Sequence, residues 1–218
     1  MNPRYKHLNG NVFAAIDTET TGADLEKHEV VEVAIIPLTY QYEVSKLPIF
    51  HIQIIPDFPE NIDIEASRKV PILQQYYADK LIKTKSDIVS LRINGLPSHI
   101  AAELLVEWFE KKLQLAPGKR IIPIGCNYAF DRGMLQKWLG NKTYEYIFSD
   151  LYRDVQVTAN YLNDLACEVS NEYPFQKVNL QYLCSTLKIE RSGAAHTALD
   201  DAYVTAKVYK EMLTRSLI

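Results

Sequence analysis

The chain has 218 residues, of which 47% are hydrophobic and 23% are charged, and its formal net charge at pH 7 is −3. This composition matches an ordinary soluble globular protein with an ample core. The negative net charge argues against a strongly adhesive nucleic-acid binder, and no stretch is apolar for long enough to span a bilayer. The first seven residues contain no apolar segment of a secretory signal, and the three widely spaced cysteines do not suggest a disulfide framework. We therefore expect a cytoplasmic protein with reduced thiols and no membrane partner.

The apolar patterns predict a few strands and then, for the most part, helices. Strands are expected at 12–16, 30–36, 50–54 and 121–124, with a hairpin between the second and the third. Helices are expected at 76–82, 100–115, 130–139, 151–165, 179–187 and 198–213. Because no repeat or linker interrupts the chain, we expect a single domain over residues 1–218.

Two carboxylates, Asp17 and Glu19, follow directly after the first predicted strand. Successive side chains alternate between the faces of a strand, so these two point the same way. A buried carboxylate pair repels unless a cation lies beside it, and Mg²⁺ prefers oxygen ligands. The pair therefore indicates a site for a divalent cation, and a solvated strand end is the alternative that it leaves open by itself.

Two further segments combine the end of a strand or loop with the start of a helix and an acidic residue. Asp131 stands at the start of the helix that follows the strand at 121–124, and His196 stands five residues before Asp201 at the start of the last helix. A carboxylate at a helix N-terminus also complements the helix dipole. For Asp131 alone, this structural role is an equal alternative.

Together, the motifs Asp17-x-Glu19-Thr-Thr-Gly, Asn127-x-x-Phe130-Asp131 and His196-x-Ala198-x-x-Asp201 resemble those of the DEDD superfamily of 3′→5′ exonucleases. The resemblance is to the DnaQ-like branch with a catalytic histidine (DEDDh), because the tyrosine branch would need a tyrosine where Thr197 stands. It spans roughly residues 12–213. It implies an α/β protein of RNase H-like fold, with a mixed five-stranded sheet and helices on both faces.

The resemblance also implies the cofactors and the site residues. Two divalent metal ions, Mg²⁺ or Mn²⁺, would be held by the four carboxylates Asp17, Glu19, Asp131 and Asp201, and Asp17 would bridge the two ions. His196 would be the general base that takes a proton from water, which suits an imidazole. The residues expected to contact the substrate are Thr18, Thr20 and Asn127.

The neighbouring residues Asp200 and Asp201 have to be told apart. Thr197 followed three residues later by Asp200 resembles a capping box, which predicts a structural role for Asp200 at the start of the helix. Asp201 has the spacing from His196 that the resemblance requires of a metal ligand.

The expected substrate is the 3′ end of single-stranded DNA, and the expected reaction is hydrolysis of its phosphodiester bond. The first alternative is a 3′→5′ exoribonuclease that trims RNA or short oligonucleotides. A more distant alternative is an inactive module that binds nucleic acid or a polymerase, which the presence of all four carboxylates and His196 disfavours. A polymerase partner has no other support, and the oligomeric state stays open. The segment at about 56–93 departs from the simplest members of the family and leaves the choice between DNA and RNA open.

Overall fold

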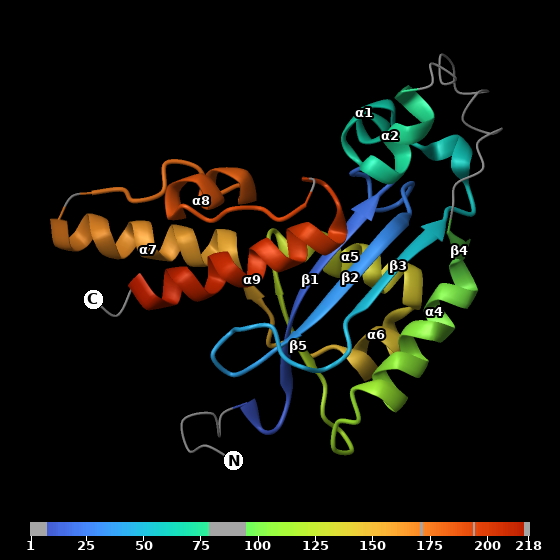
Figure 1. The fold of residues 1–218 in the computed structure, drawn as a ribbon, viewed down its shortest axis with the longest axis horizontal. Helices are drawn as coiled ribbons and strands as arrows, with labels where there is room; N and C mark the ends of the chain where they lie inside the picture. Colours follow the sequence, from blue (N-terminus) through green and yellow to red (C-terminus); the bar gives the residue numbers. More distant parts are fainter. Residues whose placement is uncertain (1–7, 79–94, 171, 194, 216–218) are drawn as a thin grey trace.

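A mixed sheet forms the centre of the computed structural model, which describes residues 8–78, 95–170, 172–193 and 195–215 (Figure 1). Within these ranges it has six strands in the order β4-β3-β2-β1-β5-β6. Their bounds are β1 Val12–Thr20, β2 Val30–Leu38, β3 Phe50–Ile55, β4 Leu96–Pro97, β5 Ile121–Gly125 and β6 Arg153–Asp154. The β1–β2 and β2–β3 pairs are antiparallel, and the other pairs are parallel. The α/β class is confirmed, but five strands was one too few. β4 and β6 have two residues each, which is too short for any periodicity to reveal.

The helices of the described residues follow the predicted ones closely near the C-terminus and less closely before it. Their bounds are α1 Ile64–Lys69, α2 Pro71–Ala78, α4 Ser98–Glu107, α5 Tyr128–Leu139, α6 Asn141–Ile147, α7 Val155–Ser170, α8 Leu180–Leu187 and α9 Ala198–Arg215. A 3₁₀-helix spans Pro59–Asn61 and a π-helix spans Trp108–Lys112. The predicted helices at 130–139, 179–187 and 198–213 are thus confirmed.

Two predicted helices have other bounds in the structure, and a third lies partly outside the described residues. The helix predicted at 100–115 is α4 followed by the π-helix. The helix predicted at 151–165 begins only at Val155, because Arg153 and Asp154 pair with β5. Of the helix predicted at 76–82, residues 76–78 belong to α2 and the rest lies outside the described residues. The short helix α6 had no predicted counterpart.

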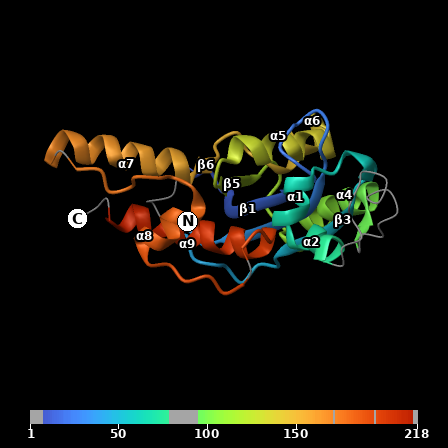
Figure 2. The same ribbon diagram turned by 90° about the horizontal axis from the view of Figure 1, so that it is seen from above.

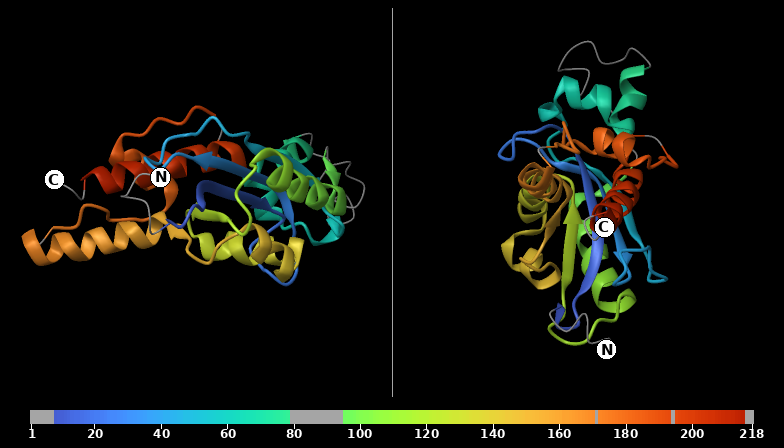
Figure 3. Two further views of the ribbon diagram at one scale, coloured as in Figure 1. Left: turned by 90° about the horizontal axis from the view of Figure 1, so that it is seen from below. Right: turned by 90° about the vertical axis from the view of Figure 1, so that its left-hand side faces the viewer.

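Helices cover both faces of the sheet, as expected, and the alternation along β1 shows why. Phe13 and Ala15 pack in the core beneath α9, whereas Ala14 and Ile16 pack in the core beneath α4 and α5. Seen from above, α5 and α6 lie on one side of the strands and α9 on the other (Figure 2). The same layering is visible from the side, and α7 runs beside α9 beyond the edge of the sheet (Figure 3). Every residue of β2 is buried, since this strand lies between the two cores.

The sheet topology brings two of the motifs together. Because β1 and β5 are parallel, their carboxyl ends lie at the same edge of the sheet, and α5 starts three residues after β5 ends. The last residues of β1, which include Asp17 and Glu19, and the first turn of α5 therefore lie close to each other.

The described part of the segment at 56–93 lies at this same edge of the sheet (Figure 1). Its helices α1 and α2 form a small core of their own with β2, in which Val31 and Leu73 are almost fully buried. The amide of Asp63, the N-cap of α1, donates a hydrogen bond of 2.7 Å to the carbonyl oxygen of Thr21. This contact ties α1 to the end of the first acidic motif, in which Thr21 stands.

Candidate active site

The end of β1 presents its carboxylates to one face of the sheet and its threonines to the other. Asp17 and Glu19 share the face that α9 covers, while Thr18 points toward α5. There the amide and the hydroxyl of Thr18 both donate to Oδ1 of Asp131, at 3.0 and 2.6 Å. Thr18 therefore fixes the Asp131 carboxylate, a role that the sequence did not predict, and its contact with substrate stays a prediction.

The third motif meets the first across the face of the sheet. One donor atom each of Glu19, His196 and Asp201 lie within 4.8 Å of one another, an arrangement that could hold a metal ion. Glu19 and Asp201 are buried, each 8% exposed, while His196 is exposed and has a left-handed backbone with φ of 65°. The structure thus brings these three predicted residues together. Asp17 and Asp131 are not part of this group, but both carboxylates interact electrostatically with Glu19.

The electrostatics of the cluster favour a cation. Burial raises the pKa of Asp17 well above its usual range, and repulsion from Asp131, Glu19, Asp201 and Glu32 adds to the effect. Burial raises the pKa of Glu19 to about 9, again with help from the neighbouring carboxylates. Burial also raises the pKa of Asp131 to about 7, although the two hydrogen bonds from Thr18 oppose this shift. Divalent cations with oxygen ligands fit such a site, because they compensate carboxylates that otherwise take up protons.

Asp154 positions the helix that carries Asp131, and sequence reasoning did not assign it to the site. Its Oδ2 accepts a 2.6 Å hydrogen bond from the amide of Tyr128 at the start of α5, and its Oδ1 accepts a 2.7 Å bond from the amide of Gln156. One carboxylate therefore holds the starts of α5 and α7. An aspartate directly before the apolar-periodic helix at 155–170 is the N-cap signal that could have revealed it.

Glu32 is a further buried carboxylate that the sequence reasoning missed. It lies directly opposite Glu19 in the β1–β2 pair and is 2% exposed. Nε2 of His51 on β3 lies 2.6 Å from its Oε1, so His51 is a partner of the cluster and not an isolated surface or core residue. The sequence signal that could have revealed Glu32 is its place as the single charged residue in the otherwise apolar strand predicted at 30–36.

Asp200 has the structural role that was predicted, but with a wider set of partners. Its amide donates a long hydrogen bond of 3.4 Å to Oγ1 of Thr197, which is one half of a capping box. Its carboxylate accepts hydrogen bonds from the amide of Gly193 at 2.7 Å and from Nη1 of Arg191 at 3.0 Å. Asp200 thereby fastens the loop before His196 to the start of α9.

The two other predicted substrate residues flank the carboxylates. The hydroxyl of Thr20 donates a 2.8 Å hydrogen bond to the carbonyl oxygen of Gly22. Asn127 is exposed, has a left-handed backbone with φ of 62°, and forms the N-cap of α5. The contacts of both residues with substrate stay predictions.

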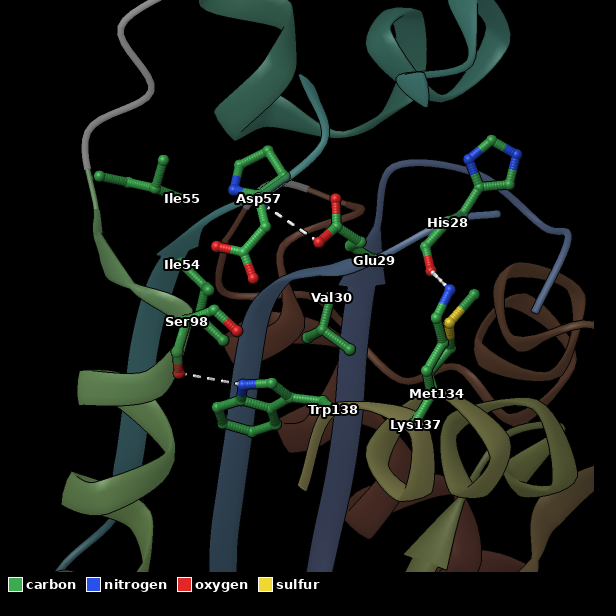
Figure 4. Close-up of a pocket in the computed structure, with 11 residues that line it drawn as sticks. His28, Glu29, Val30, Ile54, Ile55, Asp57, Ser98, Met134, Lys137 and Trp138 are labelled. Atoms are coloured by element: carbon green, nitrogen blue, oxygen red, sulfur yellow. Dashed lines mark hydrogen bonds between the residues drawn. The ribbon is translucent and has the colours of Figure 1, made fainter. Parts of the chain in front are cut away.

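A pocket of about 210 Å³ lies at the same edge of the sheet, between the start of β2, the end of β3 and the helices α4 and α5. Val30, Ile54 and Trp138 provide apolar walls, and the Trp138 indole donates to the carbonyl oxygen of Ser98 at 3.2 Å (Figure 4). Glu29 accepts a hydrogen bond from the backbone of Asp57 at the rim. The pocket is therefore a preformed cavity on the face of the sheet that α4 and α5 cover, near Thr20, which pairs with Val30. None of the predicted site residues lines it.

The fold matches those of known exonucleases. No family model and no curated protein matches the sequence. A zinc-bound complex of Escherichia coli exonuclease I with single-stranded DNA superposes with a TM-score of 0.65 at 17% identity, over 95% of this chain and 41% of that one. The nuclease domain of 3′hExo, described as a DEDDh family member bound to rAMP, gives 0.61 at 15% identity, over 94% and 92% of the two chains. Cell-death related nuclease 4 gives 0.59 at 14% identity, over 94% and 64%.

These similarities establish the fold that the sequence motifs implied, which is the RNase H-like fold of the DEDDh exonucleases. The chain spans less than half the length of exonuclease I. In the part of the chain that the structure describes, no helix is both long enough and apolar enough to cross a membrane.

Proposed function

We propose that the protein is a metal-dependent 3′→5′ exonuclease that hydrolyses the terminal phosphodiester bond of single-stranded DNA. The observation that carries this proposal is the convergence of Glu19, His196 and Asp201 within 4.8 Å, beside Asp17 and Asp131, on a fold shared with exonucleases. The carboxylates come from three separate segments, and the positions match the DEDDh motifs. A fold alone would not support a function, but a fold with this constellation does.

The residues of the chain divide the chemistry between them. Glu19 and Asp201 would hold one divalent ion, Asp131 would serve a second, and Asp17 would bridge the two. Such ions lower the pKa of water and stabilise negative charge on the phosphate oxygens. The imidazole of His196 accepts the proton of the attacking water, and its exposure leaves it free to pass that proton to solvent. Thr18 keeps the Asp131 carboxylate in place through its two hydrogen bonds.

We assign the base of the terminal nucleotide to the pocket at the same edge of the sheet, on the face that α4 and α5 cover. Its volume of about 210 Å³ is smaller than the roughly 300–1,000 Å³ of pockets for drug-sized ligands, so it suits one planar ring system. The apolar walls from Val30 and Trp138 offer stacking and van der Waals contact, which every base accepts. This assignment explains binding at a strand end without demanding a particular sequence.

RNA is the second candidate substrate. The 3′hExo nuclease domain, which was solved with rAMP, aligns over 92% of its length, while exonuclease I with its single-stranded DNA aligns over 41%. A chain of this extent is therefore compatible with either nucleic acid, and the carboxylate chemistry is the same for both.

A degradation assay tests the proposal. DNA and RNA strands of the same sequence, labelled at the 5′ end, are incubated with Mg²⁺, Mn²⁺ or EDTA. We expect a ladder that shortens from the 3′ end, faster on DNA, and no degradation in EDTA. Asp17→Asn, purified in parallel, shows whether the activity belongs to this chain. Undiminished hydrolysis after chelation, or a ladder that shortens from the 5′ end on a 3′-labelled strand, would contradict the proposal.

A further inference from the structure

A cationic side chain lies within the carboxylate cluster. Nη1 of Arg191 donates to Oδ2 of Asp200 at 3.0 Å and also contacts Oδ1 of Asp201. The Arg191 side chain is 21% exposed, and those of Asp200 and Asp201 are 5% and 11% exposed. Because the three groups are largely shielded from water, their attraction is stronger than that of a surface ion pair.

The carboxylate of Asp201 therefore takes part in both the candidate metal site and the ion pair with Arg191. It is one of the three donors that lie within 4.8 Å of each other, and one of its oxygens also contacts Arg191. A divalent ion beside Glu19 and Asp201 would lie within a few ångströms of the guanidinium, where two positive charges repel. Arg191 and the metal ion cannot both hold Asp201 without cost.

We propose that Arg191 is an internal counter-ion that competes with the metal ion for Asp201. This proposal rests on the metal site of the proposed function. Without metal, Arg191 offsets part of the charge of the cluster. When metal binds, the guanidinium leaves Asp201 and stays with Asp200. Arg191 is thus a positioning residue that weakens metal affinity and stabilises the metal-free protein.

The loop around Arg191 allows this exchange without opening the site. Besides Arg191, the carboxylate of Asp200 accepts a hydrogen bond from the amide of Gly193 at 2.7 Å and one from Oγ of Ser192 at 3.3 Å. These bonds lie on the loop that leads to His196, so the loop stays attached when Arg191 turns away from Asp201. The Arg191–Asp200 pair then keeps a charged partner for the guanidinium in both states.

Binding of Mn²⁺ to Arg191→Gln, measured by isothermal titration calorimetry, tests the proposal. Coupling between two ligands of one protein typically amounts to about 5- to 150-fold. We therefore expect Arg191→Gln to bind Mn²⁺ at least about fivefold more tightly than the wild type, and its melting temperature in EDTA to fall by about 2–4 °C. A merely structural arginine would give a lower melting temperature without tighter binding. Arg191→Lys keeps the charge on a compact ammonium, so its affinity for Mn²⁺ should lie between those of the wild type and Arg191→Gln.

Lys210→Gln is the matched control. Lys210 lies on the same helix as Asp201, and its replacement removes one positive charge from an exposed ion pair with Glu43. If Arg191→Gln binds Mn²⁺ no more tightly than the wild type and Lys210→Gln, the competition is refuted. If Arg191→Gln does not fold, an unchanged affinity of Arg191→Lys refutes it instead. Absence of Mn²⁺ binding to the wild type is a different result, since it contradicts the proposed metal site itself.

Discussion

Replacing Glu19 by glutamine should stabilise the metal-free protein at neutral and alkaline pH while it abolishes hydrolysis. The amide has nearly the shape of the carboxyl group but cannot ionise, and it is a poor ligand for a divalent cation. Loss of activity alone would not separate a ligand from any other important residue. A gain in stability does separate them, because it follows from the repulsion among carboxylates that the metal is expected to relieve.

The magnitude follows from the pKa of Glu19, which burial and the neighbouring carboxylates raise from 4.5 to about 9. Between these two values the folded protein holds a proton that the unfolded chain has released, so its free energy of unfolding falls as the pH rises. The loss is about 1.4 kcal/mol for each pH unit and about 4 kcal/mol between pH 5.5 and pH 8.5. Glu19→Gln lacks this group and should not show its share of the decline.

Urea unfolding in EDTA at about pH 5.5, 7.0 and 8.5 measures the effect. The difference in unfolding free energy between Glu19→Gln and the wild type should grow by up to about 1.4 kcal/mol per pH unit in favour of the variant. Glu168→Gln, at an exposed position of α7, is the control and should show no such trend. A difference that stays constant across the pH range would refute the reasoning, and so would a variant that remains active with Mg²⁺.

Three further substitutions test other parts of the site. His196→Ala should slow strand degradation by about 10²- to 10⁴-fold, with Mn²⁺ affinity near that of the wild type by calorimetry; loss of Mn²⁺ binding would make the histidine a ligand. Thr18→Val removes the 2.6 Å bond to Asp131 and should cost about 1–3 kcal/mol in urea unfolding. It should also raise the pKa of Asp131 further above its value of about 7, and an unchanged carboxyl titration by NMR would contradict this. Gly22→Ala would place a Cβ 2.5–2.7 Å from ring atoms of His28, so we expect a loss of about 1–3 kcal/mol in urea unfolding; unchanged stability would show that the ring simply moves aside.

Local physics determined much of what the sequence predicts. Alternation along a strand places Asp17 and Glu19 on one face whatever surrounds them, and the structure shows both residues on the same face of the sheet. The final helix begins at Ala198, so the spacing from His196 to Asp201 also follows from a short stretch of chain. The RNase H-like fold was predicted from three such motifs in order, and the comparison with solved structures confirms it.

Other features depended on contacts between distant parts of the chain, which no local pattern contains. The strand β4 exists only because Leu96 and Pro97 meet the end of β3, and the bond from Thr18 to Asp131 joins residues 113 positions apart. Glu32 belongs to the cluster because the register of β1 and β2 sets it opposite Glu19. Arg191 reaches Asp201 because the loop after α8 folds back over the start of α9. Each of these depends on strand register or on the path of a loop, which the packing of the whole sheet and its helices decides.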